Sequence, residues 1–121
     1  MSSAHDQLTV PDCLFCRIVA GQVPADVVAR NDAAVAFRDV NPQAPLHVLV
    51  VPHDHHADVA QLAASDPELL AAVVRLAHEV AHEQADGQFR LLFNTGTQAG
   101  QSVFHVHAHV LGGTRLGWSP A

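Results

Sequence analysis

The alternation of apolar and polar residues near the end of the chain predicts a β-strand over residues 101–113. Successive side chains of a strand point to opposite faces, so one face would be apolar and the other would carry three histidines. A helix would scatter those imidazoles around its circumference. The histidines are His105, His107 and His109, and the apolar residues opposite them are Phe104, Val106, Ala108 and Val110.

Hydrophobic periodicity and turn residues predict the remaining elements. Residues 13–20 repeat apolar positions at helical spacing and stop before Gly21, which favours a short helix. Residues 66–84 open with Asp66 and a proline and carry an apolar stripe, which favours a long helix. Strands are expected at residues 26–30, 33–38, 47–51 and 88–94, the first two forming a hairpin, and a flexible loop is expected at residues 96–100.

This order of elements predicts an α+β fold. It consists of a helix, a hairpin, a strand, a long helix and two final strands in a meander, which favours a five-stranded antiparallel sheet with one short and one long helix. A length of 121 residues is enough for one domain with its own core. We expect a flexible N-terminal arm at residues 1–12 and a single domain at residues 13–121.

Composition narrows the classes of function. Hydrophobic residues make up 49% of the chain and charged residues 15%, as in compact globular proteins. No apolar run approaches the roughly 18 residues of a membrane helix, and the first residues lack a signal-peptide pattern, so we expect a cytoplasmic protein without a membrane partner. The net charge of −6, with six arginines and no lysine, argues against a nucleic-acid polymer as ligand.

Two cysteines and several histidines suggest a metal site. Cys13 and Cys16 form a C-x-x-C motif, which in a cytoplasmic chain indicates a metal site or a redox pair. Thiolates and imidazoles suit zinc, and a closed structural site takes four such ligands. The other two would come from His53, His55, His56 and the histidine strand.

A second pattern resembles a metalloprotease motif. Residues 78–82 match H-E-x-x-H on the predicted long helix, where two histidines could bind zinc. However, both histidines lie away from the apolar stripe, and no third ligand follows at a recognisable spacing. We therefore interpret this stretch as a solvated helix face.

Small and polar residues precede the histidine strand. Glycine lets a ligand approach the backbone, while amide and hydroxyl groups can hydrogen-bond phosphate oxygens. The arrangement is typical of a site where one imidazole attacks phosphorus and its neighbours stabilise the charge. The residues are Asn94, Gly100, Gln101 and Ser102.

At these residues the sequence resembles the histidine triad (HIT) family, in particular its Hint branch of nucleoside phosphoramidases. The signature H-V-H-A-H-V-L-G-G stands at residues 105–113. The resemblance extends to C-L-F-C-R-I-V-A-G-Q-V-P near the start, A-F-R-D-V-N-P-Q-A-P-L-H-V-L-V-V-P in the middle, and N-T-G-x-x-A-G-Q-S before the histidines. It implies a homodimer in which the two sheets join into one, with a purine nucleotide site in each subunit.

The resemblance also implies roles for individual residues. His107 would attack the α-phosphorus and form a nucleotidyl-histidine that water hydrolyses, His109 would hydrogen-bond the phosphate, and His47 would support the triad. Asp39 would bind the ribose hydroxyls, and Trp118 would reach the partner's site or anchor the chain end in the interface. The base slot would comprise Phe15, Ile18, Phe37 and Val40, and the contacts to phosphate and leaving group would come from Asn94, Gly100, Gln101 and the catalytic Ser102.

Bacterial members with C-x-x-C carry structural zinc, and the match assigns its ligands here to Cys13, Cys16, His55 and His105. The expected function is a HIT-type hydrolase that acts on purine nucleoside phosphoramidates. Alternatives are a dinucleoside polyphosphate hydrolase, a zinc-structured nucleotide-binding protein with little turnover, and a catalytic zinc hydrolase that uses all three triad histidines as ligands.

Overall fold

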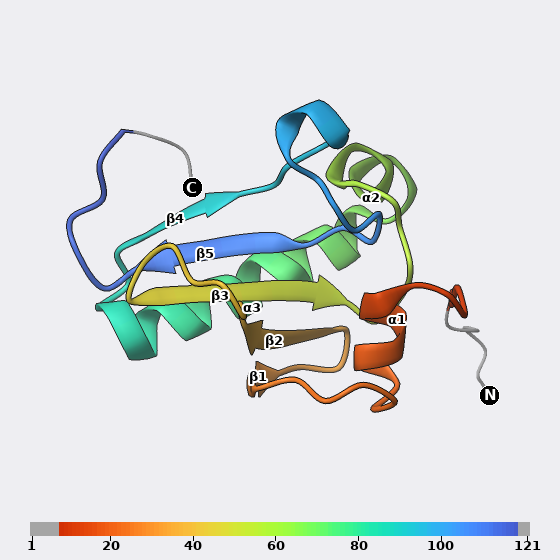
Figure 1. Cartoon of the computed structure of the whole chain (residues 1–121), viewed down its shortest axis with the longest axis horizontal. Helices are drawn as coiled ribbons and strands as arrows, with labels where there is room; N and C mark the ends of the chain where they lie inside the picture. The colour runs from red at the N-terminus through yellow and green to blue at the C-terminus, as the bar shows by residue number, and fades with distance from the viewer. Residues whose placement is uncertain (1–7, 119–121) are drawn as a thin grey trace.

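A five-stranded antiparallel sheet organises the computed structural model, which describes residues 8–118 (Figure 1). The strand order is β1-β2-β3-β5-β4, so the predicted α+β class and antiparallel sheet are confirmed. The strands are β1 (Val27–Arg30), β2 (Ala34–Arg38), β3 (Leu46–Pro52), β4 (Phe89–Leu92) and β5 (Ala108–Gly112).

The final two strands pair with each other, but their placement differs from a simple meander. β5 lies between β3 and β4, which leaves β4 at the sheet edge. Burial explains the order, because four of the five residues of β5 are buried whereas every residue of β4 is only half-buried. The more buried strand, β5, therefore occupies the interior of the sheet, beside the fully buried β3.

Two of the helices match the predicted short and long helices. They are α1 (Leu14–Val19) and α3 (Pro67–Ala85). A further helix, α2 (Val59–Ser65), was not predicted, because it buries only Leu62 and so shows no periodic apolar stripe. Its start is stabilised by the Asp58 side chain, which accepts a hydrogen bond from the Gln61 backbone N–H. A 3₁₀ turn, η1 (Thr97–Ala99), occupies the predicted flexible loop.

The long helix α3 covers one face of the sheet, behind the strands in Figure 1. Its predicted apolar stripe is buried there against even-numbered residues of β2, β3 and β5. The Asp66 side chain caps the first turn, and Asp86 adopts a left-handed conformation with φ of 53° at the end. Because side chains alternate along a strand, the odd-numbered side chains of the same strands point to the opposite face, away from α3.

That opposite face carries the short helix and the candidate site. Phe15 of α1 packs there with Val35, Phe37, Leu49 and Val51. The alternation of β3 that directs Leu49 and Val51 to this face also directs His47 to it. The sheet therefore separates the hydrophobic core under α3 from the face that carries the candidate site.

The histidine strand is shorter than predicted. Only His109 lies within β5, whereas His105 lies in a bend and His107 in the irregular segment just before the strand. In that segment the Val106 N–H donates to the His56 carbonyl, so the chain pairs with a loop instead of extending the ladder with β3. Phe104 is 50% exposed and does not join the buried Val106.

Part of the predicted arm contacts the domain. The Leu8 N–H donates to Asp54 Oδ1 over 3.1 Å, and the His55 N–H donates to the Leu8 carbonyl over 2.8 Å. Residues 1–7 of the arm and residues 119–121 lie outside the described residues, so the division into arm and domain stays a prediction. Within the described residues, no helix has the length and apolarity needed to cross a membrane.

Candidate functional site: a cysteine and histidine cluster beside a histidine-lined cavity

Two cysteines and two histidines from three parts of the chain meet at the start of α1. Cys13 caps the helix and Cys16 lies one turn later, while His55 follows β3 and His105 precedes β5. His105 Nδ1 lies 3.4 Å from the sulfurs of both cysteines, and Cys16 Sγ lies 3.5 Å from His55 Nδ1. All four ligand atoms lie within 4.8 Å of one another.

These distances fit a tetrahedral metal ion. With bonds of about 2.3 Å to sulfur and 2.0 Å to nitrogen, a tetrahedral ion holds sulfur and nitrogen roughly 3.5 Å apart. The observed separations of 3.4 and 3.5 Å are close to that value. Burial also raises the pKa of the Cys16 thiol, so its thiolate requires a nearby cation. The cluster is therefore able to bind a metal, as predicted for this set of ligands.

The tautomer of His105 is suited to metal binding. Its Nε2 lies 2.9 Å from the Pro52 carbonyl, so Nε2–H donates and the lone pair of Nδ1 faces the thiols. His105 is completely buried. Among the three histidines of the 53–56 loop, His55 presents its Nδ1 to the cluster, whereas His53 and His56 lie outside it.

His107 has the opposite arrangement of ring nitrogens. Its Nδ1 lies 2.9 Å from the His105 carbonyl, so Nδ1–H donates and Nε2 keeps its lone pair. Burial lowers the pKa of His107, which keeps the ring neutral. The Phe15 ring packs edge-on against it at 5.0 Å between centroids. His107 thus meets the structural requirements of a nucleophilic imidazole, namely a neutral ring with one nitrogen held and the other available.

A chain of hydrogen bonds orients His109. The Gln43 backbone N–H donates to His47 Nδ1 over 2.9 Å, so His47 carries its proton on Nε2. That Nε2–H lies 3.0 Å from His109 Nδ1, so His109 in turn carries its proton on Nε2. Burial lowers the pKa of His47, and it lowers the pKa of His109 to about 4, so both rings are neutral at pH 7.

The proton on His109 Nε2 has no acceptor. Among the described residues this nitrogen is buried and makes no hydrogen bond. A buried N–H that lacks an acceptor costs free energy, so it indicates a position where a ligand oxygen binds.

A metal ion fits this second group of side chains poorly. Asp39, His47 and His109 also place ligand atoms within 4.8 Å of one another. However, the nitrogen that His47 presents to the group carries a proton, because the Gln43 N–H occupies the other nitrogen. The three triad histidines also form no common ligand set among residues 8–118, since His105 belongs to the cysteine cluster, His109 to this one and His107 to neither. This geometry disfavours the catalytic zinc alternative.

A cavity of about 610 Å³ opens above these histidines. His107 and His109 line it together with Asp39, Gly100 and Ser102. The predicted base-slot residues Phe15, Ile18, Phe37 and Val40 line it as well. Leu14, Leu49 and Val103 also line it and were not predicted, because only folding brings these isolated apolar positions to one wall.

Three predicted contact residues do not line the cavity: Asn94, Gln101 and Trp118. Gln101 is buried and supports the loop, since its Oε1 accepts from the Gly96 N–H and its Nε2 donates to the carbonyls of Ala57 and Val103. Trp118 is 92% exposed on this protomer. The sequence alone could not distinguish a buried amide that supports a loop from one that contacts a ligand.

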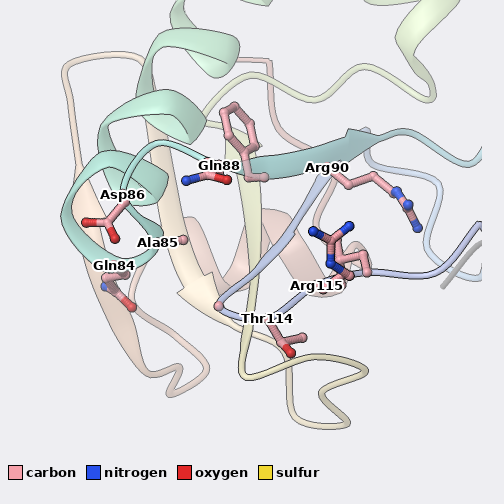
Figure 2. Close-up of a pocket in the computed structure, with 10 residues that line it drawn as sticks. Gln84, Ala85, Asp86, Gln88, Arg90, Thr114 and Arg115 are labelled. Carbon is pink, nitrogen blue, oxygen red and sulfur yellow. The ribbon is translucent and has the colours of Figure 1, made fainter.

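A second cavity, of about 620 Å³, lies between the end of α3 and strand β4 (Figure 2). Its wall includes Gln84, Asp86, Arg90 and Arg115, and it contains no histidine or cysteine. Figure 2 shows Arg90 and Arg115 on the same side of this cavity. This second cavity offers neither an imidazole nor a thiol, so the histidine-lined cavity is the candidate active site.

Several known proteins resemble this chain. The family model described as "Scavenger mRNA decapping enzyme C-term binding" matches residues 12–116. A HIT-like protein from Synechocystis is 44% identical over 113 residues, which is 90% of this chain and 96% of that protein. The purine nucleoside phosphoramidase of Escherichia coli is 35% identical over 108 residues, which is 88% of this chain and 91% of that protein.

Solved structures agree with this likeness. A HIT family hydrolase from Legionella pneumophila superposes with a TM-score of 0.85 at 40% identity, covering 91% of this chain and all of the other. A histidine triad protein from Clostridium difficile superposes with a TM-score of 0.86 at 32% identity, covering 93% of this chain. The fold is therefore that of the HIT hydrolases, which confirms the predicted enzyme class. The chain belongs to the histidine triad family.

Proposed function

We propose that the chain hydrolyses purine nucleoside phosphoramidates, breaking the P–N bond at the α-phosphorus through a nucleotidyl-His107 intermediate. The observation that carries this proposal is the pairing of opposite tautomers at one cavity. His107 offers a lone pair on Nε2, while His109 offers a buried N–H that has no acceptor. A nucleophile beside a fixed donor is what attack on a phosphoryl group requires.

In the first step, His107 Nε2 attacks the α-phosphorus and the P–N bond breaks. The departing amine takes up a proton from water, relayed by the Ser102 hydroxyl at the cavity wall. His109 Nε2–H donates to a non-bridging phosphate oxygen throughout. Because His47 and Gln43 hold the other nitrogen of His109, this donor is oriented before the substrate binds.

In the second step, the hydroxide left when that water gave up its proton attacks phosphorus, and the bond between His107 and phosphorus breaks. The products are a nucleoside monophosphate and the neutral imidazole of His107. The His105 carbonyl keeps the proton on His107 Nδ1 through both steps, so the same nitrogen serves as nucleophile and then as leaving group. The neutral imidazole that departs from this phosphoimidazolium is a better leaving group than the original amine.

The remaining walls fit the rest of a nucleotide. Asp39 accepts from the Asn41 N–H through Oδ1 and lies 3.4 Å from His47 Nε2 through Oδ2, which fixes the carboxylate as an acceptor for ribose hydroxyls. Phe15 and Phe37 meet edge-to-face with centroids 5.6 Å apart and form the rigid apolar wall against which the purine packs. The name of the Escherichia coli relative supports a purine nucleoside phosphoramidate as substrate.

Zinc at Cys13, Cys16, His55 and His105 is proposed as structural, since four protein ligands close a tetrahedral site. When bound, it supplies a cross-link between α1 and the histidine segment. Two other functions of this chain are alternatives to the proposed one. They are hydrolysis of dinucleoside polyphosphates and nucleotide binding with little turnover. The first would cleave P–O bonds more rapidly than P–N bonds, and the second would bind nucleotide without cleaving either bond.

Quenched turnover tests the proposal directly. The wild-type protein is mixed with an adenosine phosphoramidate, quenched in acid-free denaturant within milliseconds to seconds, and analysed by intact and peptide mass spectrometry. We expect a nucleotidyl adduct on the peptide that contains His107, together with release of the amine before the nucleoside monophosphate. Turnover without any adduct, or an adduct on another histidine, would contradict the proposed mechanism.

The protein is also proposed to form a homodimer through the β4 edge of the sheet. Arg90 of β4 donates to the Gly117 carbonyl over 2.6 Å, which places the exposed Trp118 beside this edge. An open edge strand and an exposed tryptophan both favour association. Multi-angle light scattering at micromolar protein should give twice the chain mass, and a monomer mass would contradict this prediction.

A further inference from the structure

The two histidines of the H-E-x-x-H motif lie outside the proposed active site. Both are exposed on the outer face of α3, and their ring centroids are 6.3 Å apart with an interplanar angle of 31°. His78 also packs against the ring of Phe89 at 6.4 Å, which restricts its orientation. The two imidazoles are therefore neighbours on one helix face, as residues four apart should be.

Their separation suits a shared metal ion. Two imidazoles bound to one ion through bonds of about 2.0 Å have ring centroids roughly 5 Å apart. The observed 6.3 Å therefore closes to this value by small rotations of exposed side chains. A neutral imidazole is a good ligand for borderline divalent ions such as Ni²⁺, Cu²⁺ and Zn²⁺.

The surroundings attract a cation. A groove of about 390 Å³ on this face is lined by His78, His82, Glu79 and Glu83, and also by Arg30. Glu79 and Glu83 add negative charge beside the histidines. In addition, His82 lies in the last turn of α3, where the helix dipole favours positive charge.

We propose that His78 and His82 form a two-histidine chelate for a borderline divalent transition metal on the outer face of α3, separate from the cysteine cluster. The site binds the metal ion but does not catalyse a reaction. A protease of the H-E-x-x-H type needs a third protein ligand. Within residues 8–118, two groups of three or more ligand residues lie close together, and neither group includes His78 or His82. Water fills the remaining coordination positions.

The experiment uses untagged protein with its cysteine cluster already loaded with zinc, and Ni²⁺ as the probe. Calorimetry measures the number of Ni²⁺ ions bound, and NMR identifies the histidines that the paramagnetic ion broadens. We expect one additional Ni²⁺ per chain, with the His78 and His82 signals broadened first. The melting temperature should rise with Ni²⁺, because the chelate exists only when the helix is folded.

Single substitutions His78→Ala and His82→Ala should each weaken Ni²⁺ binding by about tenfold or more, since each leaves one protein ligand. A matched control is the double substitution His82→Ala/Glu83→His. It keeps the number of histidines at ten but places the second histidine of the pair five residues after His78. Five residues place the imidazoles on different helix faces, so this variant should also bind weakly. Because positions 82 and 83 are exposed, the metal-free melting temperature of the double variant should stay unchanged.

Three outcomes would overturn the proposal. The first is equal Ni²⁺ affinity in wild type and the double variant. The second is broadening centred on His53 or His56 in place of His78 and His82. The third is displacement of zinc from the cysteine cluster without any additional Ni²⁺ bound.

Discussion

Replacement of His107 by asparagine is expected to lower kcat by roughly 10³-fold or more, as removal of a nucleophile does in other enzymes. Such a loss corresponds to about 4 kcal/mol of transition-state stabilisation. Asparagine suits the position because its side-chain N–H can still donate to the His105 carbonyl in place of Nδ1–H. The variant therefore removes the lone pair of Nε2 while retaining the local hydrogen bond.

Two further measurements distinguish loss of the nucleophile from loss of structure. The His107→Asn variant should keep its metal, as determined by emission spectroscopy, because the four ligand atoms of the cysteine cluster are untouched. It should also bind a nucleoside monophosphate with an affinity close to wild type, since Asp39 and the aromatic wall remain. Loss of metal, or hydrolysis near the wild-type rate, would contradict the covalent mechanism.

The same substitution at the neighbouring triad position serves as the matched control. His109→Asn removes the donor to the phosphate oxygen but leaves the nucleophile, so we expect a smaller loss of kcat, on the order of 10²-fold. Mass spectrometry during turnover should still detect a nucleotidyl adduct in this variant. The adduct should be absent from His107→Asn, and its presence there would assign the nucleophile to another residue.

The sequence predicted the parts of the fold that depend on local periodicity. The apolar stripe of α3 is buried as predicted, and its N-terminal cap at Asp66 forms as the residue order indicated. Local signals could not place β5 between β3 and β4, because that choice depends on which strand buries more surface in the finished sheet. The helix α2 was missed for the same reason, since its single buried residue, Leu62, meets its neighbours only after folding.

The sequence likewise predicted some features of the candidate site and not others. The resemblance to the HIT family predicted the residues of the cysteine cluster and most of the residues that line the cavity. Motif spacing alone left the two histidine ligands open. The proton positions on His105 and His109 could not be predicted, because they depend on groups of residues distant in sequence. Pro52 orients His105, and Gln43 orients His109 through His47. Opposite chemical roles for similar imidazoles therefore arise from backbone contacts.

The second large effect is expected from Cys13→Ala, which should abolish stoichiometric metal binding and lower the stability of the fold. Cys13 contributes both a ligand atom and the cap of α1, because its sulfur accepts from the Cys16 N–H. A metal that binds only the folded chain stabilises it by about 4 kcal/mol when its free concentration is 1,000 times Kd. For a domain of this size, a loss of that magnitude lowers the melting temperature by roughly 10 to 20 °C.

Adjacent histidines in the loop after β3 give the matched comparison for this prediction. His55→Ala should lose the metal as Cys13→Ala does, whereas His56→Ala should retain it, because only His55 presents a nitrogen to the cluster. Metal content is measured on protein purified without chelator, and melting temperature is measured with and without added zinc. Loss of metal from His56→Ala but not from His55→Ala would reassign the fourth ligand.

Turnover in Cys13→Ala should survive in the protein that stays folded, since the metal is proposed to hold the structure and not to contact the substrate. The rate will not be wild type, because α1 carries Phe15, which packs against the His107 ring at 5.0 Å and lines the cavity. Loosening of α1 should therefore raise KM more than it lowers kcat. A collapse of kcat to the level of His107→Asn, in protein shown by circular dichroism to be folded, would instead favour a direct role for the metal in the reaction.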